Sequence, residues 1–219
     1  MSRAKLLIAA CFAVLALSAL TVATASAAEG WDVAGTALPT NSKAAIKSPA
    51  NVGQKGLLEV ALGEGTITIK CEANTVSITG GALVGPTGIE ATSVGFEECF
   101  VVNNETCNLG QTTINTVPIH GVAKLDPASP LNTLILVLPK TKNTFATILF
   151  IGNTCALKGV QPVTGDVDLL VDAGVHATTV HLVLVSSLPK SLKVGNSEAS
   201  LHKLDADVQL VSGSTWNFL

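Results

Sequence analysis

The chemistry that this sequence suggests most directly lies in its cysteines. Four of them, Cys71, Cys99, Cys107 and Cys155, follow a first segment that also contains Cys11. Thiols can bind a metal, exchange electrons or form disulfides. No two of the four have the C-x-x-C spacing of a redox or zinc motif, whereas an even number of cysteines in an exported chain typically forms disulfides. We therefore predict two disulfides.

The spacing of the cysteines favours one pairing and leaves another open. Cys99 and Cys107 face each other if the chain folds back around a loop at Val102–Asn104, because opposed residues on antiparallel strands have a separation that fits a disulfide. The second bond then joins Cys71 to Cys155. The alternative pairs Cys71 with Cys99, and Cys107 with Cys155.

The same loop contains Asn104-Glu105-Thr106, which has the form of a glycosylation acceptor. Asparagine also favours tight turns, because its side chain binds the backbone of the residues that follow. We interpret this triplet as part of a turn.

One segment of the sequence resembles the nucleophile motif of a serine hydrolase. Gly195–Ala199 differs by one residue from the G-x-S-x-G motif, with Ser197 at its centre, and His202 and Asp205 follow. That motif works on a turn between a parallel strand and a helix, and nothing upstream predicts such a context. A hydrolase that uses Ser197 and His202 is therefore the least favoured hypothesis, and we expect no catalytic residue.

Metal and cofactor sites are also not expected. The four histidines lack the spacing of shared metal ligands. Asp166 and Asp168 form an alternating acidic pair, as do Asp205 and Asp207, and together they could bind calcium. Neither segment has the glycine of a calcium loop, and alternating charges are typical of the solvent face of a strand. Calcium binding by these aspartates is left open.

The beginning of the chain indicates export. Arg3 and Lys5 precede an apolar run, residues 6–20, and Ala25-Ser26-Ala27 has the form of a cleavage site, which together describe a signal peptide over residues 1–27. The run is shorter than the ~20 residues that span a bilayer. We expect cleavage near Ala27, no transmembrane segment in the mature chain, and a secreted or cell-surface location.

Charge and composition exclude nucleic acid as a partner. Removing residues 1–27 leaves 219 − 27 = 192 residues, with 13 − 2 = 11 basic residues against 16 acidic ones, and so a net charge of 11 − 16 = −5. Arg3 is the only arginine, and aromatic residues are only 4% of the chain. Nucleic-acid binding relies on basic side chains and on stacking platforms. The partner itself is not predictable.

The pattern after residue 56 predicts strands. Short runs of Val, Ile, Leu and Thr are separated by Gly, Pro, Asn and Asp, and "GTITIKC" alternates with Ile67, Ile69 and Cys71 on one face. The continuous apolar runs "LNTLILVLP" and "TFATILFIG" suit central strands covered on both faces, or strands whose outer face meets a partner. Pro118 predicts an edge or a break, and "SEASLHKLDADV" could hold a helical turn or two.

These patterns predict a single all-β domain over residues 57–219, an antiparallel β-sandwich or barrel stapled by two disulfides. Residues 28–56 are richer in small, polar and turn residues, so we expect an extended, partly ordered lead-in.

The chain resembles a group of exported four-cysteine proteins from actinobacterial lineages that have no known activity. The resemblance covers about residues 57–170, with a closing tryptophan near Trp216, and depends mainly on spacing. It is carried by Ile69-Lys70-Cys71, Phe96-Glu97-Glu98-Cys99, Cys107, Ile114–Gly121, Cys155 and Val163-Thr164-Gly165. It implies an exported β-rich fold and no known activity, and it offers no catalytic residues to carry over.

Taken together, the sequence favours an exported, non-enzymatic protein with a structural, cell-surface or binding role. A second hypothesis is a carrier of an apolar small molecule, since the apolar runs hold more apolar surface than one core face requires and a barrel interior could use it.

Overall fold

The computed structural model describes residues 29–49, 56–63, 65–72, 77–127, 129–141, 143–172, 177–184 and 192–219. The expected signal peptide, residues 1–27, lies outside these ranges. In the described part of the chain all elements of regular secondary structure are β-strands, and the strands pair antiparallel. The all-β, antiparallel prediction is therefore confirmed.

Eight strands form a closed ring, and the ring decides between sandwich and barrel. Each strand pairs with the next ring strand along the chain, and β20 pairs with β3 to close the circle. A ring in this order is an up-and-down barrel. Its members are β3 (Lys43–Lys47), β7 (Gly81–Val84), β8 (Gly88–Ala91), β13 (Ile119–Asp126), β14 (Ser129–Pro139), β17 (Val167–Asp172), β18 (Thr179–Leu184) and β20 (Ser197–Leu210).

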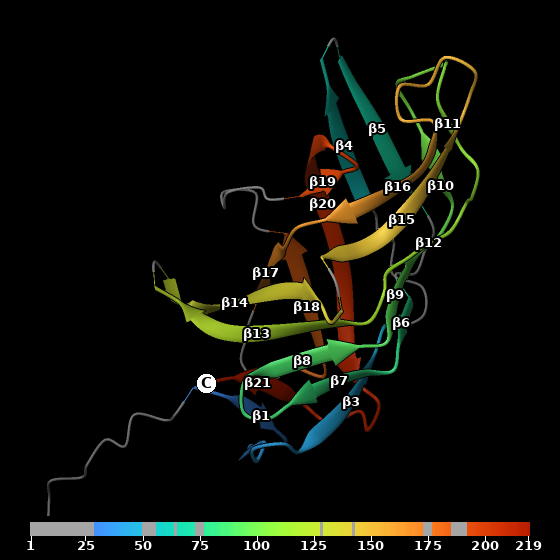
Figure 1. Cartoon of the computed structure of the whole chain (residues 1–219). Helices are drawn as coiled ribbons and strands as arrows, with labels where there is room; N and C mark the ends of the chain where they lie inside the picture. Colours follow the sequence, from blue (N-terminus) through green and yellow to red (C-terminus); the bar gives the residue numbers. More distant parts are fainter. Residues whose placement is uncertain are drawn as a thin grey trace, which may run out of the picture.

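Apart from β21, the strands after β3 that do not belong to the ring are insertions that all leave from one end of it. They follow β3, β8, β14 and β18, which run in the same direction because every second strand of an antiparallel ring does. Figure 1 shows most of them gathered above the ring strands. They are β4 (Gly56–Leu62), β5 (Gly65–Cys71), β6 (Ser77–Thr79), β9 (Ser93–Phe96), β10 (Cys99–Val101), β11 (Asn108–Leu109), β12 (Ile114–Asn115), β15 (Thr144–Ile151), β16 (Gly159–Thr164) and β19 (Lys193–Val194).

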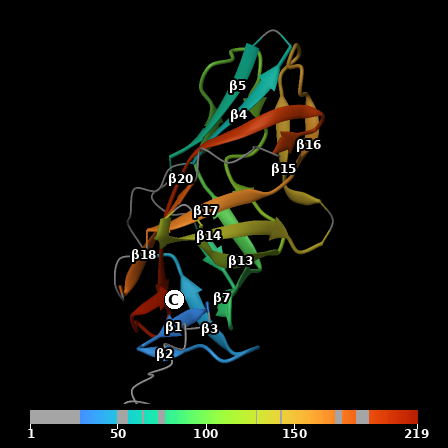
Figure 2. The same cartoon turned by 90° about the vertical axis from the view of Figure 1, so that its left-hand side faces the viewer.

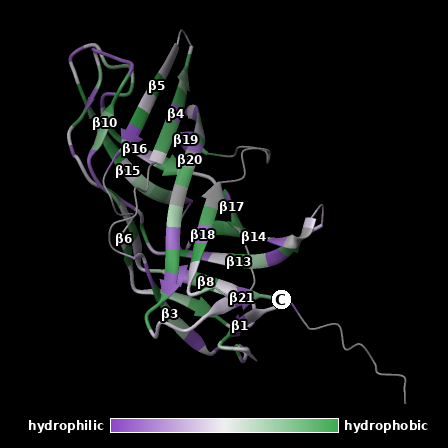
Figure 3. Cartoon of the chain, turned by 180° about the vertical axis from the view of Figure 1, so that it is seen from behind, coloured by the Kyte–Doolittle hydropathy of each residue, from purple (hydrophilic) through white to green (hydrophobic). Residues whose placement is uncertain are grey.

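The long strand β20 joins the insertions to the ring. Its second half pairs with β18 and β3, and its first half pairs with β4 and β19. Figure 2 shows it running from one part of the molecule to the other. The segment that could have held a helical turn lies inside this strand. Ala199 in its first half and Ala206, Val208 and Leu210 in its second half are buried, and Figure 3 shows hydrophobic and hydrophilic segments following one another along it.

Three short strands lie at the opposite end of the ring from the insertions. They are β1 (Trp31–Val33), β2 (Thr36–Ala37) and β21 (Trp216–Phe218). Trp31 and Trp216 are fully buried with ring centroids 5.7 Å apart, and the Phe218 ring lies 4.9 Å from that of Trp31. The expected lead-in thus contributes strands of its own, and β3 is part of the ring.

Several local predictions agree with the structure. Ile67 and Ile69 of β5 are buried, and the chain breaks at Pro118 between β12 and β13. These features depend only on nearby residues, because side-chain alternation and the missing proline N–H act locally.

The preferred disulfide pairing is wrong, and the alternative is correct. The bonds join Cys71 to Cys99 and Cys107 to Cys155. A Cys99–Cys107 hairpin does not form because β10 pairs with β5, which places Cys99 directly opposite Cys71. The chain then continues to β11, which pairs with β15.

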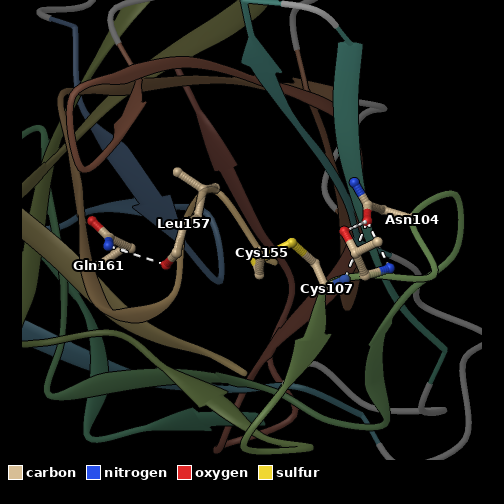
Figure 4. Close-up of a disulfide and its surroundings, with 6 residues drawn as sticks. Asn104, Cys107, Cys155, Leu157 and Gln161 are labelled. Atoms are coloured by element: carbon tan, nitrogen blue, oxygen red, sulfur yellow. Dashed lines mark hydrogen bonds between the residues drawn. A yellow bond between two sulfur atoms is a disulfide. The ribbon is translucent and has the colours of Figure 1, made fainter. Parts of the chain in front are cut away.

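The loop before Cys107 forms the turn expected from its asparagine. Asn104 Oδ1 accepts hydrogen bonds from the backbone N–H groups of Thr106 (3.0 Å) and Cys107 (3.1 Å) and from the Thr106 hydroxyl (2.7 Å). Figure 4 shows Asn104 on one side of the Cys107–Cys155 bond and the Gln161 amide donating to the Leu157 carbonyl on the other.

Candidate functional site

Residues of the ring and of the insertions together line a cavity of about 190 Å³. Ring strands contribute inward side chains because alternate residues of a strand point to the same face. Examples from the ring are Ile46, Ile89, Ile135, Leu169, Leu182 and Val208. The insertions close over these with Leu58, Ile69, Phe96, Phe145, Ile148 and Val163.

The lining of this cavity is almost wholly apolar. Apart from Glu90, Thr116 and His120, each lining residue is aliphatic or aromatic, a glycine, or the disulfide-bonded Cys71. The lining thus lacks the convergent polar groups that hold a nucleophile or a metal in place. It can accept a hydrocarbon group by dispersion and by exclusion from water.

The size of the cavity fits a small ligand. An eight-stranded barrel has an interior that side chains just fill or that holds one small molecule. An engineered apolar cavity of ~150 Å³ in another protein stays dry and binds benzene. The cavity described here is somewhat larger, and its walls come from strands far apart in the sequence.

The polar residues of the lining lie together on one side. Glu90 of β8 and His120 of β13 occupy opposed positions on paired strands. Their neighbours Ile89 and Ile119 face the cavity, so alternation directs the polar ends of Glu90 and His120 to the other face of the sheet. Thr116 precedes β13, and its Oγ1 accepts a hydrogen bond from the Val94 N–H at 2.8 Å. His120 Nδ1 is buried and has no hydrogen-bond partner.

Two lysines surround the carboxylate of Glu90. Lys43 Nζ donates a hydrogen bond to Oε1, and Lys140 Nζ lies 3.4 Å from Oε2. The hydrogen bond from Lys43 lowers the pKa of Glu90, and Lys140 adds to the effect, while burial opposes it. Glu90 is therefore ionised at neutral pH. We refer to Lys43, Glu90 and Lys140 as the lysine–glutamate cluster.

The residues proposed for a hydrolase are not brought together. Ser197 and His202 lie five positions apart on β20, and a strand rises ~3.3 Å per residue, so their Cα atoms are roughly 16 Å apart. His202 Nε2 instead lies 2.7 Å from Glu59 Oε2 of β4.

The two acidic pairs lie apart in the fold, with Asp166 directly before β17, Asp168 on β17, and Asp205 and Asp207 on β20. Asp207 Oδ1 lies 2.5 Å from His181 Nδ1, which is directly opposite on β18. Burial raises the pKa of Asp168, with Asp166 adding to the rise and Lys124 opposing it. Within the described ranges, no three His, Cys, Asp or Glu residues are grouped so that they could hold a metal ion.

The sequence indicated the cysteines correctly but did not reveal the cavity residues. The small residues Ala91, Ala146 and Ala206 line it, and they occur in runs that resemble any core strand. The only available signal was the excess of apolar strands. Residues brought together by ring closure have no spacing in common, so sequence motifs do not find them.

Comparison with known proteins identified no relative of this chain. Neither the protein-family models, the curated proteins nor the solved structures gave a match to this chain. In the described part of the chain, no helix has the length and apolar character needed to cross a membrane.

Proposed function

We propose that the protein is an exported, non-enzymatic binding protein that carries an apolar small molecule inside its barrel. The observation that carries this proposal is the apolar cavity of about 190 Å³ lined jointly by ring and insertion strands. Among the structural, surface and binding roles expected from the sequence, binding is the one that makes use of such a cavity.

A ligand in the cavity supplies packing contacts that its apolar walls otherwise lack. Side chains that face a space without partner atoms make fewer dispersion contacts there. A ligand that fills the space restores such contacts and buries its own apolar surface as well. Selection for packing alone favours larger side chains at Ala146 and Ala206, which line the cavity.

Export is supported by two independent features. The first residues have the three-part pattern of a signal peptide, and two disulfides join the chain. Disulfides persist in oxidising compartments, such as the periplasm or the outside of a cell. We therefore place the carrier outside the cytoplasm, secreted or at the cell surface.

Binding of small apolar probes tests the proposal. Toluene and naphthalene should raise the melting temperature of the oxidised protein in a concentration-dependent way, because a ligand that binds only the folded state stabilises it. Ala206→Leu adds side-chain volume inside the cavity, so the probe loses its space. The apparent dissociation constant of each probe should rise at least about tenfold, and the shift in melting temperature should shrink accordingly. The cavity-lining variant Ala146→Leu provides a second, independent filling.

Ala61→Leu is the matched control, because Ala61 is an exposed strand residue on β4 that does not line the cavity. It should bind the probes like the wild type. If no apolar probe stabilises the wild type, or if Ala206→Leu and Ala61→Leu respond alike, the cavity is a packing feature and the carrier proposal fails.

A further inference from the structure

The lack of hydrogen-bonding groups on the cavity wall defines the class of ligand, in an argument that rests on the proposed function. The backbone of the ring supplies no such groups to the interior. Each ring strand pairs with a neighbour on both sides, so its N–H and C=O groups bond within the sheet. A ligand inside the ring therefore meets the side chains of these strands.

The three polar residues of the lining direct or commit their polar atoms elsewhere. Alternation turns the Glu90 carboxylate and the His120 imidazole to the outer face of the sheet, away from the side that their apolar neighbours present to the cavity. There the lysine–glutamate cluster holds the carboxylate. Thr116 Oγ1 accepts the hydrogen bond from the Val94 N–H. The surface that the described lining residues present to a ligand is therefore almost entirely hydrocarbon.

The volume and the side-chain types of the lining limit the ligand further. An apolar cavity of ~150 Å³ binds benzene, so a cavity of about 190 Å³ suits a ligand of roughly seven to ten carbon atoms. Many lining side chains are β-branched and buried, among them Ile69, Ile135, Ile148 and Val208. Because such side chains are stiff at χ1, the wall has a fixed shape that favours a compact ligand.

We infer that the ligand is a compact hydrocarbon of roughly seven to ten carbon atoms without any hydroxyl, amine or carboxyl group. A polar group in the cavity gives up its hydrogen bonds to water and gains no partner on the wall, and an apolar environment strongly disfavours such an unpaired group. The selectivity of the site thus arises from what its wall lacks. The hydrocarbon enters the cavity, and its hydroxylated analogue stays in water.

Two pairs of probes test the inference: toluene with phenol, and p-xylene with p-cresol. The members of each pair have nearly the same shape and differ by a methyl group in place of a hydroxyl. In titrations of the wild-type protein at pH 7, each hydrocarbon should bind at least about thirtyfold more tightly than its phenol, because only the phenol loses hydrogen bonds to water. A smaller ratio of affinities in either pair overturns the inference.

Variants of the wall test the physical cause. Val208→Thr and Val137→Thr each replace a methyl group of the lining with a hydroxyl of similar size. At least one of them should lower the ratio of toluene to phenol affinity about fivefold, because the new hydroxyl offers phenol a hydrogen-bond partner. The matched control is Val122→Thr, at a position that is 52% exposed and does not line the cavity. Its ratio should equal that of the wild type.

The outcomes separate the two proposals. If phenols bind the wild type nearly as well as the hydrocarbons do, the wall has a polar partner, so the inference fails and the carrier proposal stands. If Val208→Thr and Val137→Thr both keep the wild-type ratio, the missing partner is not the cause of selectivity and the inference fails as well. If neither hydrocarbon binds the wild type, the carrier proposal itself fails. Unfolding curves of each variant confirm that it is folded.

Discussion

Cys71 and Cys99 lie directly opposite each other on the antiparallel strands β5 and β10, with their Cα atoms 3.9 Å apart. The bond between them therefore fixes the edge of the inserted sheet, and Cys71 also lines the cavity. The second bond, Cys107–Cys155, joins the segment before β11 to the turn between β15 and β16.

Removing either disulfide should destabilise the protein by several kcal/mol. In the chain-entropy model the bonds, which span 28 and 48 positions, contribute about 3.5 and 4 kcal/mol, respectively. Denaturant unfolding of Cys71→Ala/Cys99→Ala and of Cys107→Ala/Cys155→Ala measures these losses. Peptide mapping without reduction checks the pairing independently, and a peptide that joins Cys99 to Cys107 would contradict it.

The aromatic group at the opposite end of the ring should carry much of the stability there. Trp216→Ala should cost about 3–5 kcal/mol, because Trp216 is fully buried against Trp31. Trp216→Phe should cost much less, since it keeps most of the ring and removes a buried Nε1–H that has no partner. Phe100→Ala, at a position that is 40% exposed, is the control, with an expected cost near the ~0.5 kcal/mol of surface changes. Equal losses for Trp216→Ala and Phe100→Ala would contradict the packing described here.

Two glycines with positive φ allow the cost of an unfavourable backbone conformation to be measured apart from the cost of a steric clash. Gly152 (φ +131°) and Gly159 (φ +103°) flank the turn that contains Cys155, but an added Cβ would lie 2.0 Å from the Thr106 carbonyl oxygen at Gly152 and meet nothing at Gly159. Gly159→Ala should cost about 1–2 kcal/mol for the backbone alone. Gly152→Ala should cost clearly more, because the oxygen it meets belongs to the backbone. Equal melting temperatures for the two variants would contradict this difference.

Asp168 should be a source of instability at neutral pH. Its pKa is raised in the folded state, first by burial and then by Asp166, so the folded protein disfavours the charged form. For a carboxyl with a raised pKa, the penalty exists above the folded pKa and disappears as the pH falls toward the ordinary value of 3.8. Asp168→Asn should therefore stabilise the protein at pH 7 and lose this advantage in acid.

Denaturant unfolding at several pH values measures the effect of Asp168→Asn. Asp166→Asn removes only the second cause and should give a smaller gain. Because Asp168 is only half-buried, both gains should be modest. A loss of stability for Asp168→Asn at pH 7 would show that its carboxylate makes a favourable contact that outweighs desolvation.

The sequence by itself determined the features that depend on neighbours along the chain. The alternation of "GTITIKC" predicted the buried face of β5, Pro118 ended one strand before the next began, and Asn104 formed its turn through its own side chain. The even cysteine number predicted disulfides for the same reason: the thiols' chemistry and compartment do not depend on which strands meet.

The tertiary structure alone decided which distant segments became neighbours. Cys71 bonds to Cys99, not to Cys155, because β10 pairs with β5, and a spacing along the chain does not contain that choice. Ring closure depends on β3, whose residues were expected to form only a lead-in, meeting β20 about 160 positions later. The cavity follows from that closure, since its walls are side chains that share a face only after the ring has formed.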